Sequence, residues 1–251
     1  MIRLVRAELF KLRTTRLYIG LLAAAAALVV AVTALQLALG GDTSLSIAGA
    51  AEVVQTEADL RSVLDVTGVA ALFTLILGAT AVASEHRHHT VASTFLLTPA
   101  RSRVVIAKLA GYFIAGALFG IVVEAAATAV AIGWLAATGA PVPFGSTVAA
   151  GLALTPVATG LAAAFGVGIS AAIPNQLGAV LVAIGWVMVA EQLLGGLVPG
   201  LAVWLPFSGA SIAVTGQATD IGVAAGLALF VGYVFVLTSI ALQVTRRRDI
   251  S

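Results

Sequence analysis

The three histidines of the chain stand together in the segment Glu85-His86-Arg87-His88-His89. Histidine and glutamate are side chains that bind transition metals, so this cluster could be drawn as a metal site. Metal ligands must converge on one point, however, and an arginine in the middle of the cluster opposes a bound cation. We therefore expect a solvated polar connection between helices here, with no metal site and no catalytic residue.

Two carboxylates, Glu124 and Glu191, interrupt long apolar runs, and no Lys or Arg occurs from Leu109 to Thr245. A charge at the middle of a bilayer is costly unless it is protonated, paired or hydrated. We expect Glu124 to be neutral, hydrogen-bonded to Ser or Thr, or facing a wet cavity. It then either serves a substrate path or joins two helices. For Glu191 the structural alternative is favoured, because the membrane interface is close.

Nucleotide-binding motifs are excluded. A P-loop needs Gly-Lys-Ser/Thr at the end of a glycine-rich turn. The two lysines of the chain, Lys11 and Lys108, follow Phe10 and Ala107 instead. The spacing of glycines in residues 166–171 fits a dinucleotide fingerprint, but the segment lies inside an apolar run with no strand before it. We therefore expect no cofactor in this chain.

The composition is that of a membrane protein. Of the 251 residues, 61% are hydrophobic and 10% are charged, and the mean hydropathy is +1.11. A soluble domain of this size has about 25% charged residues, because its surface faces water. The absence of cysteine excludes disulfides and thiolate chemistry. The net charge of +2 is small, which argues against nucleic acid as a partner.

Six apolar runs are long enough to cross a bilayer, since about 20 helical residues span its hydrocarbon core. These runs predict an all-α, polytopic membrane protein with a single transmembrane domain over residues 1–251. The expected spans are 17–39, 64–84, 104–137, 147–172, 177–197 and 220–244.

The distribution of basic residues predicts the orientation. Twelve of the thirteen Lys and Arg residues lie in 1–16, 85–108 and 246–248, which six spans place on one side of the membrane. The positive-inside rule makes this side cytoplasmic, so both termini and the loop 85–103 are expected there. The thirteenth, Arg61, lies in an acidic outer loop, 40–65.

Two further segments have their own character. In residues 1–16, Ile2, Val5, Leu9 and Leu12 recur at helical spacing among basic residues, which predicts an amphipathic helix in the cytoplasmic interface, in contact with membrane lipid. The alternative is an ordinary basic flank of the first span. Residues 198–219 are apolar but contain Pro199 and Pro206, which favours an outer re-entrant or interfacial segment.

Residues 85–108 resemble the cytoplasmic loop of ATP-binding-cassette (ABC) type-2 permeases. That loop reads Glu, Thr, a Leu-Leu pair, Pro, Arg and finally Lys. The matching positions here are Glu85, Thr90, Leu96, Leu97, Pro99, Arg101, Arg103 and Lys108. The loop stands between the second and third of six spans, as in that family, and His89 stands where the family often has Gly.

The resemblance implies a coupling helix over 90–98, which contacts an ATPase through an apolar face. Thr90 is expected to cap this helix, Val91, Phe95 and Leu96 to form its face, and Glu85 to brace the loop. Arg101 and Arg103 either pair with acidic groups of the ATPase or hold the loop at anionic lipid.

The family implies a non-enzymatic permease of a bacterial cytoplasmic membrane, which exports its substrate. It works as a homodimer or beside a similar permease, with two copies of a separate ABC ATPase that binds ATP and Mg. By family analogy, translocation follows helices two and five, with residues 198–219 as an outer gate. The carboxylates Glu124 and Glu191 are the candidate residues of the substrate path.

Two rival functions remain. An ATPase-independent secondary transporter or channel would need titratable groups along a path, for which Glu124 and Glu191 are the candidates. A membrane-embedded enzyme would have to use His86, His88 and His89.

Overall fold

The computed structural model describes residues 1–39, 54–65, 67–82, 101–173, 175–216 and 220–247. Every secondary-structure element in these ranges is a helix, as predicted. Six helices are long and apolar enough to cross a membrane. They cover Arg16–Leu39, Glu57–Ala79, Arg103–Thr138, Ser146–Ala172, Gln176–Leu197 and Val223–Val244. The chain is therefore a multi-pass α-helical membrane protein.

The first half of the bundle consists of α1 (Ile2–Thr14), α2 (Arg16–Leu39), α4 (Glu57–Val63), α5 (Thr67–Ala79) and α8 (Arg101–Thr138). The second half begins with α9 (Ser146–Ala172) and α10 (Gln176–Gly185), followed by the π-helical turn η1 (Trp186–Ala190) and α11 (Glu191–Leu197). It ends with the short helices η2 (Ala202–Trp204), η3 (Pro206–Ser211) and α12 (Ile212–Val214), and the long α13 (Val223–Arg247).

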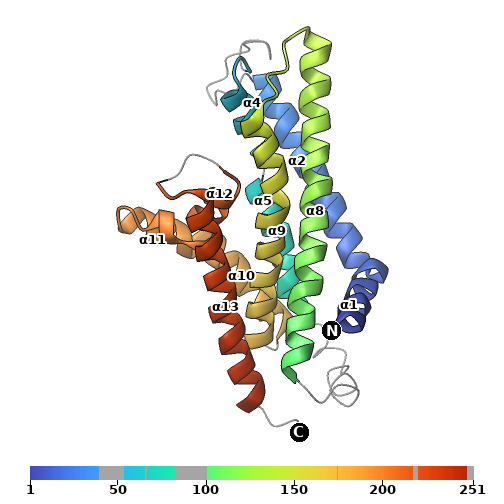
Figure 1. The fold of residues 1–251 in the computed structure, drawn as a ribbon, viewed down its shortest axis with the longest axis vertical. Helices are drawn as coiled ribbons and strands as arrows, with labels where there is room; N and C mark the ends of the chain where they lie inside the picture. The colour runs from blue at the N-terminus through green and yellow to red at the C-terminus, as the bar shows by residue number, and fades with distance from the viewer. Residues whose placement is uncertain (40–53, 66, 83–100, 174, 217–219, 248–251) are drawn as a thin grey trace.

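Helix α9 is the most buried of the six membrane-crossing helices and packs against α5, α8 and α13. Figure 1 shows α8 running along the height of the bundle, with the N-terminus and the described end of α13 near its lower end and α4 at the upper end. Helix α11 leaves the bundle sideways. Termini at the same end of the bundle agree with an even number of spans.

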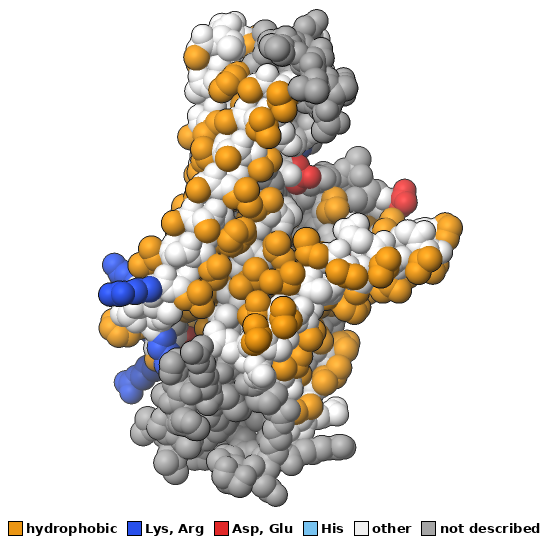
Figure 2. Space-filling model, turned by 180° about the vertical axis from the view of Figure 1, so that it is seen from behind, with side chains coloured by type: hydrophobic (Ala, Val, Ile, Leu, Met, Phe, Trp, Pro, Cys, Tyr) orange, Lys and Arg blue, Asp and Glu red, His pale blue; other side chains and the backbone are white. Residues whose placement is uncertain are grey.

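The surface fits a lipid environment. In the view from behind in Figure 2, hydrophobic side chains cover the face between the two ends, and Lys and Arg side chains gather beside α1. Helix α13 is the least buried of the six, and large apolar side chains such as Phe235 and Val236 are exposed on it. Such a surface requires an apolar solvent.

Glycines allow α8 and α9 to lie in direct backbone contact. A Cβ added at Gly116 would lie 2.7 Å from Cβ of Ala163, and one added at Gly120 would overlap the hydroxyl of Thr159. Gly116 and Gly120 are four residues apart and face the same neighbour, which is how small residues bring membrane helices together. The sequence pattern is therefore explained by packing within the chain.

The last part of the outer loop 40–65 contains a helix, α4. Thr56 and Asp59 form a capping box, in which Thr56 N donates to Asp59 Oδ2 at 2.7 Å and Asp59 N donates to Thr56 Oγ1 at 3.2 Å. These reciprocal bonds satisfy two backbone donors and start α4. Helix α4 (Glu57–Val63) therefore stands within the predicted loop 40–65 and precedes α5, and the candidate span Glu57–Ala79 includes both.

Helix α4 is also tied to the start of α9. The carboxylate of Glu57 accepts hydrogen bonds from the backbone N–H of Thr147 and, at 3.0 Å, of Val148. Both N–H groups lie in the first turn of α9, where they have no partner inside the helix. A carboxylate there also interacts favourably with the helix dipole. Glu57 thus joins the second and fourth membrane-crossing helices at this end.

Helix α1 packs on α8 through a buried glutamate that the predicted apolar stripe omits. Glu8 accepts from Lys108 Nζ at 2.9 Å through Oε2 and from Lys11 Nζ at 2.9 Å through Oε1. Leu12 is buried beside it, whereas Ile2 is 78% exposed. The packed face of α1 therefore centres on Glu8 and Leu12. Contact of α1 with lipid stays a prediction.

Candidate functional site

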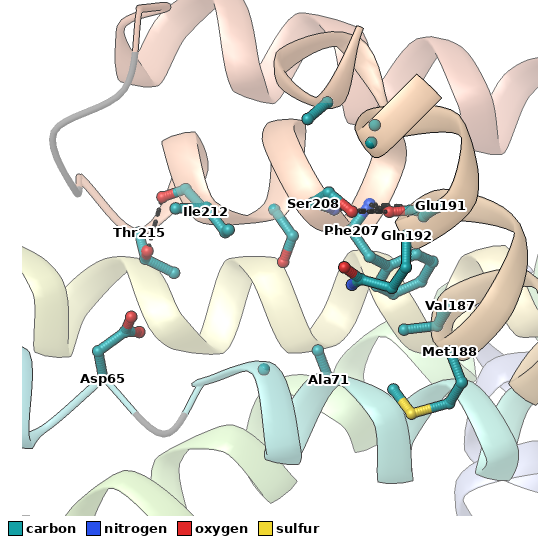
Figure 3. A pocket seen from close by; sticks show the side chains of 15 residues that line it. Asp65, Ala71, Val187, Met188, Glu191, Gln192, Phe207, Ser208, Ile212 and Thr215 are labelled. Carbon is teal, nitrogen blue, oxygen red and sulfur yellow. Dashed lines mark hydrogen bonds between the residues drawn. The ribbon is translucent and has the colours of Figure 1, made fainter. Parts of the chain in front are cut away.

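A cavity of about 600 Å³ lies between the second and fifth membrane-crossing helices and the segment that follows the fifth. Its walls come from α5 and the residues before it, from η1 and α11, and from η2, η3 and α12 (Figure 3). The lining residues are Asp65, Gly68, Ala71, Val187, Met188, Glu191, Gln192, Gly195, Gly196, Ala202, Phe207, Ser208, Ser211, Ile212 and Thr215. Its volume is in the range of small-molecule sites.

The fifth helix changes its winding where it meets this cavity. The π-helical turn η1 separates α10 from α11, and Val187 and Met188 of this turn line the cavity. A π turn inserts an extra residue into a helix and is frequent at functional sites. The turn directs Val187 and Met188 toward α5 and is followed at once by Glu191 (Figure 3).

Glu191 binds the segment that follows its own helix. Its carboxylate accepts from Trp186 Nε1 at 2.7 Å, from Phe207 N at 3.1 Å, and from Ser208 N and Oγ at 2.6 and 2.7 Å. Phe207 and Ser208 stand in the first turn of η3, whose N–H groups would otherwise be unpaired. Four donors around one carboxylate compensate its burial. Glu191 therefore fixes η3 against α11.

Three aromatic rings fix the other side of η3. Phe207 lies edge-to-face against Phe165 of α9 and Phe230 of α13, with ring centroids 5.4 and 5.5 Å apart. Edge-to-face pairs are favourable beyond the area they bury. Residues 198–219 were expected to form an outer re-entrant or interfacial segment. The short helices η2, η3 and α12, between Ala202 and Val214, form much of this segment. Residues 217–219 lie outside the described part of the chain.

Arg61 and Glu124 form an ion pair inside the bundle. Arg61 Nη1 lies 3.7 Å from Glu124 Oε1, and the two side chains are 7% and 4% exposed. Arg61 Nη2 also donates to the carbonyl oxygen of Thr215 at 3.1 Å. The guanidinium passes directly over Gly151 of α9, and a Cβ there would overlap it. One side chain of α4 thus contacts α8, α9 and the end of the outer segment.

This pair was not foreseen. Glu124 was expected to be neutral, hydrogen-bonded to Ser or Thr, or facing a wet cavity, and none of these alternatives included Arg61, which was expected in the outer loop 40–65. Because α4 is helical, it carries Arg61 into the bundle, where the guanidinium compensates the carboxylate. A pair at this position is costly to break, since either partner alone would be a buried charge.

The predicted site residues fall into three groups. Glu191 lines the cavity, whereas Glu124 lies beside it in the ion pair and is not part of the lining. Arg101 begins α8, and the side chain of Arg103 is exposed near the same helix end. The other predicted coupling residues lie outside the described part of the chain. They are Glu85, Thr90, Val91, Phe95, Leu96, Leu97 and Pro99.

The three histidines that were considered as metal ligands also lie outside the described residues. They are His86, His88 and His89. Within the described ranges, no group of three or more His, Asp or Glu side chains could hold a metal ion.

Comparison of the sequence with protein-family models and with curated proteins finds no match.

Proposed function

We propose that the chain is the permease subunit of an ABC type-2 exporter, which works with a separate ATPase. The observation that carries the proposal is the motif in residues 85–108, from Glu85 through the Leu96-Leu97 pair to Lys108, between the second and third of six membrane-crossing helices. The cavity between the second and fifth of these helices supports it, because this is where the resemblance places the substrate path.

The geometry of α8 supplies a route for the coupling. This helix is continuous from Arg101 to Thr138, 38 residues, or about 57 Å at 1.5 Å per residue. Its first turn follows the proposed coupling residues, and Glu124 further along meets Arg61. Arg61 in turn holds Thr215, which lines the cavity. A displacement of the start of α8 by an ATPase would therefore reach the cavity through one helix and one side chain.

The proposal includes a permease dimer, as a homodimer or beside a similar permease, in the cytoplasmic membrane of a bacterium. Two ATPase copies bind ATP and Mg, and their closure moves residues 85–103. In this scheme the termini and the basic end of α1 face the cytoplasm, and the cavity opens toward the other side when substrate is released. The exposed apolar surfaces of α11 and α13 are available for lipid or for the second permease.

Co-purification with a candidate ATPase tests the proposal. Phe95→Asp and Leu96→Asp introduce charges into the proposed apolar contact, so they should abolish capture of the ATPase and stimulation of its activity. The matched control is Phe144→Asp, which alters a half-exposed phenylalanine in the connection between α8 and α9 and should leave capture intact. Retained complex and coupled ATP hydrolysis in both loop variants would refute the contact.

The ion pair of Arg61 and Glu124 favours one alternative, a secondary transporter that needs no ATPase, because buried ionisable groups often mark ion pathways in membranes. Transport driven by a proton gradient into liposomes that contain only this chain would support that alternative. Transport that requires an added ATPase and ATP would support the exporter.

A further inference from the structure

We propose that the cavity between α5, α11 and η3 binds a neutral amphipathic molecule that is dissolved in the membrane, in preference to an ion. This inference names the substrate class of the permease and in that respect rests on the proposed function. The binding step itself requires no ATPase. The juxtaposition that carries it is a mainly apolar lining with an uncharged amide, beside charged groups that already have partners.

The charged groups at one end of the cavity are engaged. The guanidinium of Arg61 binds the carbonyl oxygen of Thr215, which lines the cavity, and lies 3.7 Å from Glu124. Asp65, which also lines the cavity, is not a free carboxylate. An ion that entered here would lose its hydration and would find no unpaired counter-ion among these groups.

Glu191 is engaged as well. Its carboxylate receives hydrogen bonds from Trp186, Phe207 and Ser208, which hold η3 against α11. A cation that recruited this carboxylate would have to compete with those donors and would loosen the first turn of η3. The cavity therefore offers a charged ligand no compensation for its lost hydration, whereas a neutral ligand needs none.

The rest of the lining suits an apolar ligand body. Val187 and Met188 of the π turn and Phe207 of η3 form an apolar wall (Figure 3). The thioether of Met188 is an adaptable contact for ligands of different shapes. Phe207 is held in place by Phe165 and Phe230, so its part of the wall is rigid.

Two glycines leave the cavity open. Gly68 of α5 and Gly196 of α11 line it, and a Cβ added at either position would meet no atom within 4 Å. The space beside these two backbone segments is therefore available to the ligand.

An uncharged side chain can hold the polar end of such a ligand. Figure 3 shows the amide of Gln192 pointing in among the lining residues. An amide can donate a hydrogen bond and accept another, which suits a hydroxyl or carbonyl group without a charge. Few polar groups in a mainly apolar lining are typical of sites for small organic molecules.

The cavity also borders the apolar surface of the bundle. Met188 lines the cavity and is half-exposed, and the neighbouring Val189 of η1 and Leu193 of α11 are exposed. An exposed apolar surface on a membrane-crossing helix is adapted to lipid. A molecule dissolved in lipid would therefore reach the cavity past η1 and α11, without crossing the bundle.

Three photoreactive probes with the same dodecyl chain and diazirine separate charge from shape. One ends in a hydroxyl, one in a trimethylammonium and one in a sulfonate group. The full chain is labelled with each in phosphatidylcholine nanodiscs without ATPase, and mass spectrometry locates the label. Leu193 is exposed, so all three probes should label it, and its labelling corrects for partition into the bilayer.

Labelling of η3 reports the cavity, because most residues of this helix are buried. After correction, we expect the alcohol to label η3 at least about tenfold more than either ion does, since an ion loses its hydration there. Equal labelling of η3 by the three probes, or no labelling by the alcohol, would overturn the proposal.

Variants place the label in the cavity. Gly68→Leu and Gly196→Leu fill it from positions where an added Cβ meets no atom, so each should reduce labelling of η3 by the alcohol about tenfold. The matched control is Gly133→Leu in α8, which is equally uncrowded but lies outside the cavity and should leave labelling unchanged. Undiminished labelling in both filling variants, with normal melting temperatures, would overturn the site.

Gln192→Leu tests the polar end. The hydroxyl of the alcohol loses its partner, so labelling of η3 should fall about fivefold, whereas a probe with the plain dodecyl chain should be unaffected. Unchanged labelling by the alcohol would overturn the role of Gln192.

The result is separable from the proposed function. A chain that takes the alcohol into the cavity but captures no ATPase would refute the exporter and leave the binding site standing. A chain that captures the ATPase through Phe95 and Leu96 but shows equal labelling of η3 by the three probes would refute the neutral site alone.

Discussion

Arg61 of α4 and Glu124 of α8 face each other at 3.7 Å in a bundle whose membrane-crossing helices carry few other charges. The guanidinium also binds the carbonyl oxygen of Thr215, so one cation joins a short outer helix, a long membrane-crossing helix and the wall of the cavity. The first prediction concerns this pair.

Arg61→Met leaves Glu124 buried without its counter-ion and should lower the free energy of unfolding by about 3–5 kcal/mol. The double variant Arg61→Met, Glu124→Leu removes both charges and should recover most of this loss. Unfolding in mixed micelles measures both, with Arg3→Met on the exposed side of α1 as the control. A double variant as unstable as the sum of its single variants would contradict the pairing.

Glu191→Gln should loosen η3 without removing it from the bundle. The amide keeps one oxygen acceptor but loses the charge that four donors share, so we expect a loss of about 1–3 kcal/mol. Hydrogen exchange at the amides of Phe207 and Ser208 should become faster. Asp220→Asn makes the same chemical change at an exposed site and should leave both amides protected; equal exchange in the two variants would argue against the tether.

The contact of α1 with α8 should weaken in acid. Burial raises the pKa of Glu8, but the charge of Lys108 and the hydrogen bonds from Lys108 and Lys11 outweigh it, so the pKa lies below the usual 4.5. A lowered pKa in the folded state means that Glu8 stabilises the docked helix above pH 4.5 and that this contribution disappears as the pH falls through the folded-state pKa.

A fluorescent label on α1 can follow this undocking as the pH is lowered. The variant Glu8→Gln should show weaker docking at neutral pH and no acid transition in this range. If the same transition persists in Glu8→Gln, another group causes it.

Gly116→Leu should disrupt the contact of α8 with α9, because even a Cβ at this position lies 2.7 Å from Cβ of Ala163 and from the carbonyl oxygen of Thr159. Overpacking of this kind costs about 1–3 kcal/mol, or more where backbones touch. Gly133→Leu is the matched control, since it lies in the same helix with nothing near its Cβ position. Thermal unfolding compares the two, and similar melting temperatures would contradict the close packing.

The membrane-crossing helices were predictable because lipid imposes a simple rule. A helix satisfies the hydrogen bonds of its own backbone, so the length of an apolar run is enough to identify a span. The apolar runs of α2, α8 and α9 were predicted as spans on this basis. The same rule does not say which helices touch. The contact of α1 with α8 through Glu8 and Lys108 depends on residues far apart in the sequence, and the periodicity of the apolar residues did not reveal it.

The burial of Arg61 was missed although local signals existed. Thr56 and Asp59 have the spacing of a capping box, and Leu60, Val63 and Leu64 continue the apolar pattern on either side of Arg61. A buried carboxylate such as Glu124 can also be compensated by a cation from another segment of the chain, since residues 109–245 contain no Lys or Arg. The hydrogen bonds of Glu191 could not be predicted, because they depend on how the chain turns after α11. The coupling role of residues 85–100 stays a prediction.

Because Gly151 has no side chain, it leaves room for Arg61, and this limits which residues can occupy the two positions. The guanidinium of Arg61 occupies the volume that a methyl group at position 151 would fill. A methyl group at position 151 would therefore force the guanidinium to move from its place between Glu124 and the carbonyl oxygen of Thr215. Position 151 thus limits where the cation can lie, and we expect positions 61, 124 and 151 to vary in concert among homologues.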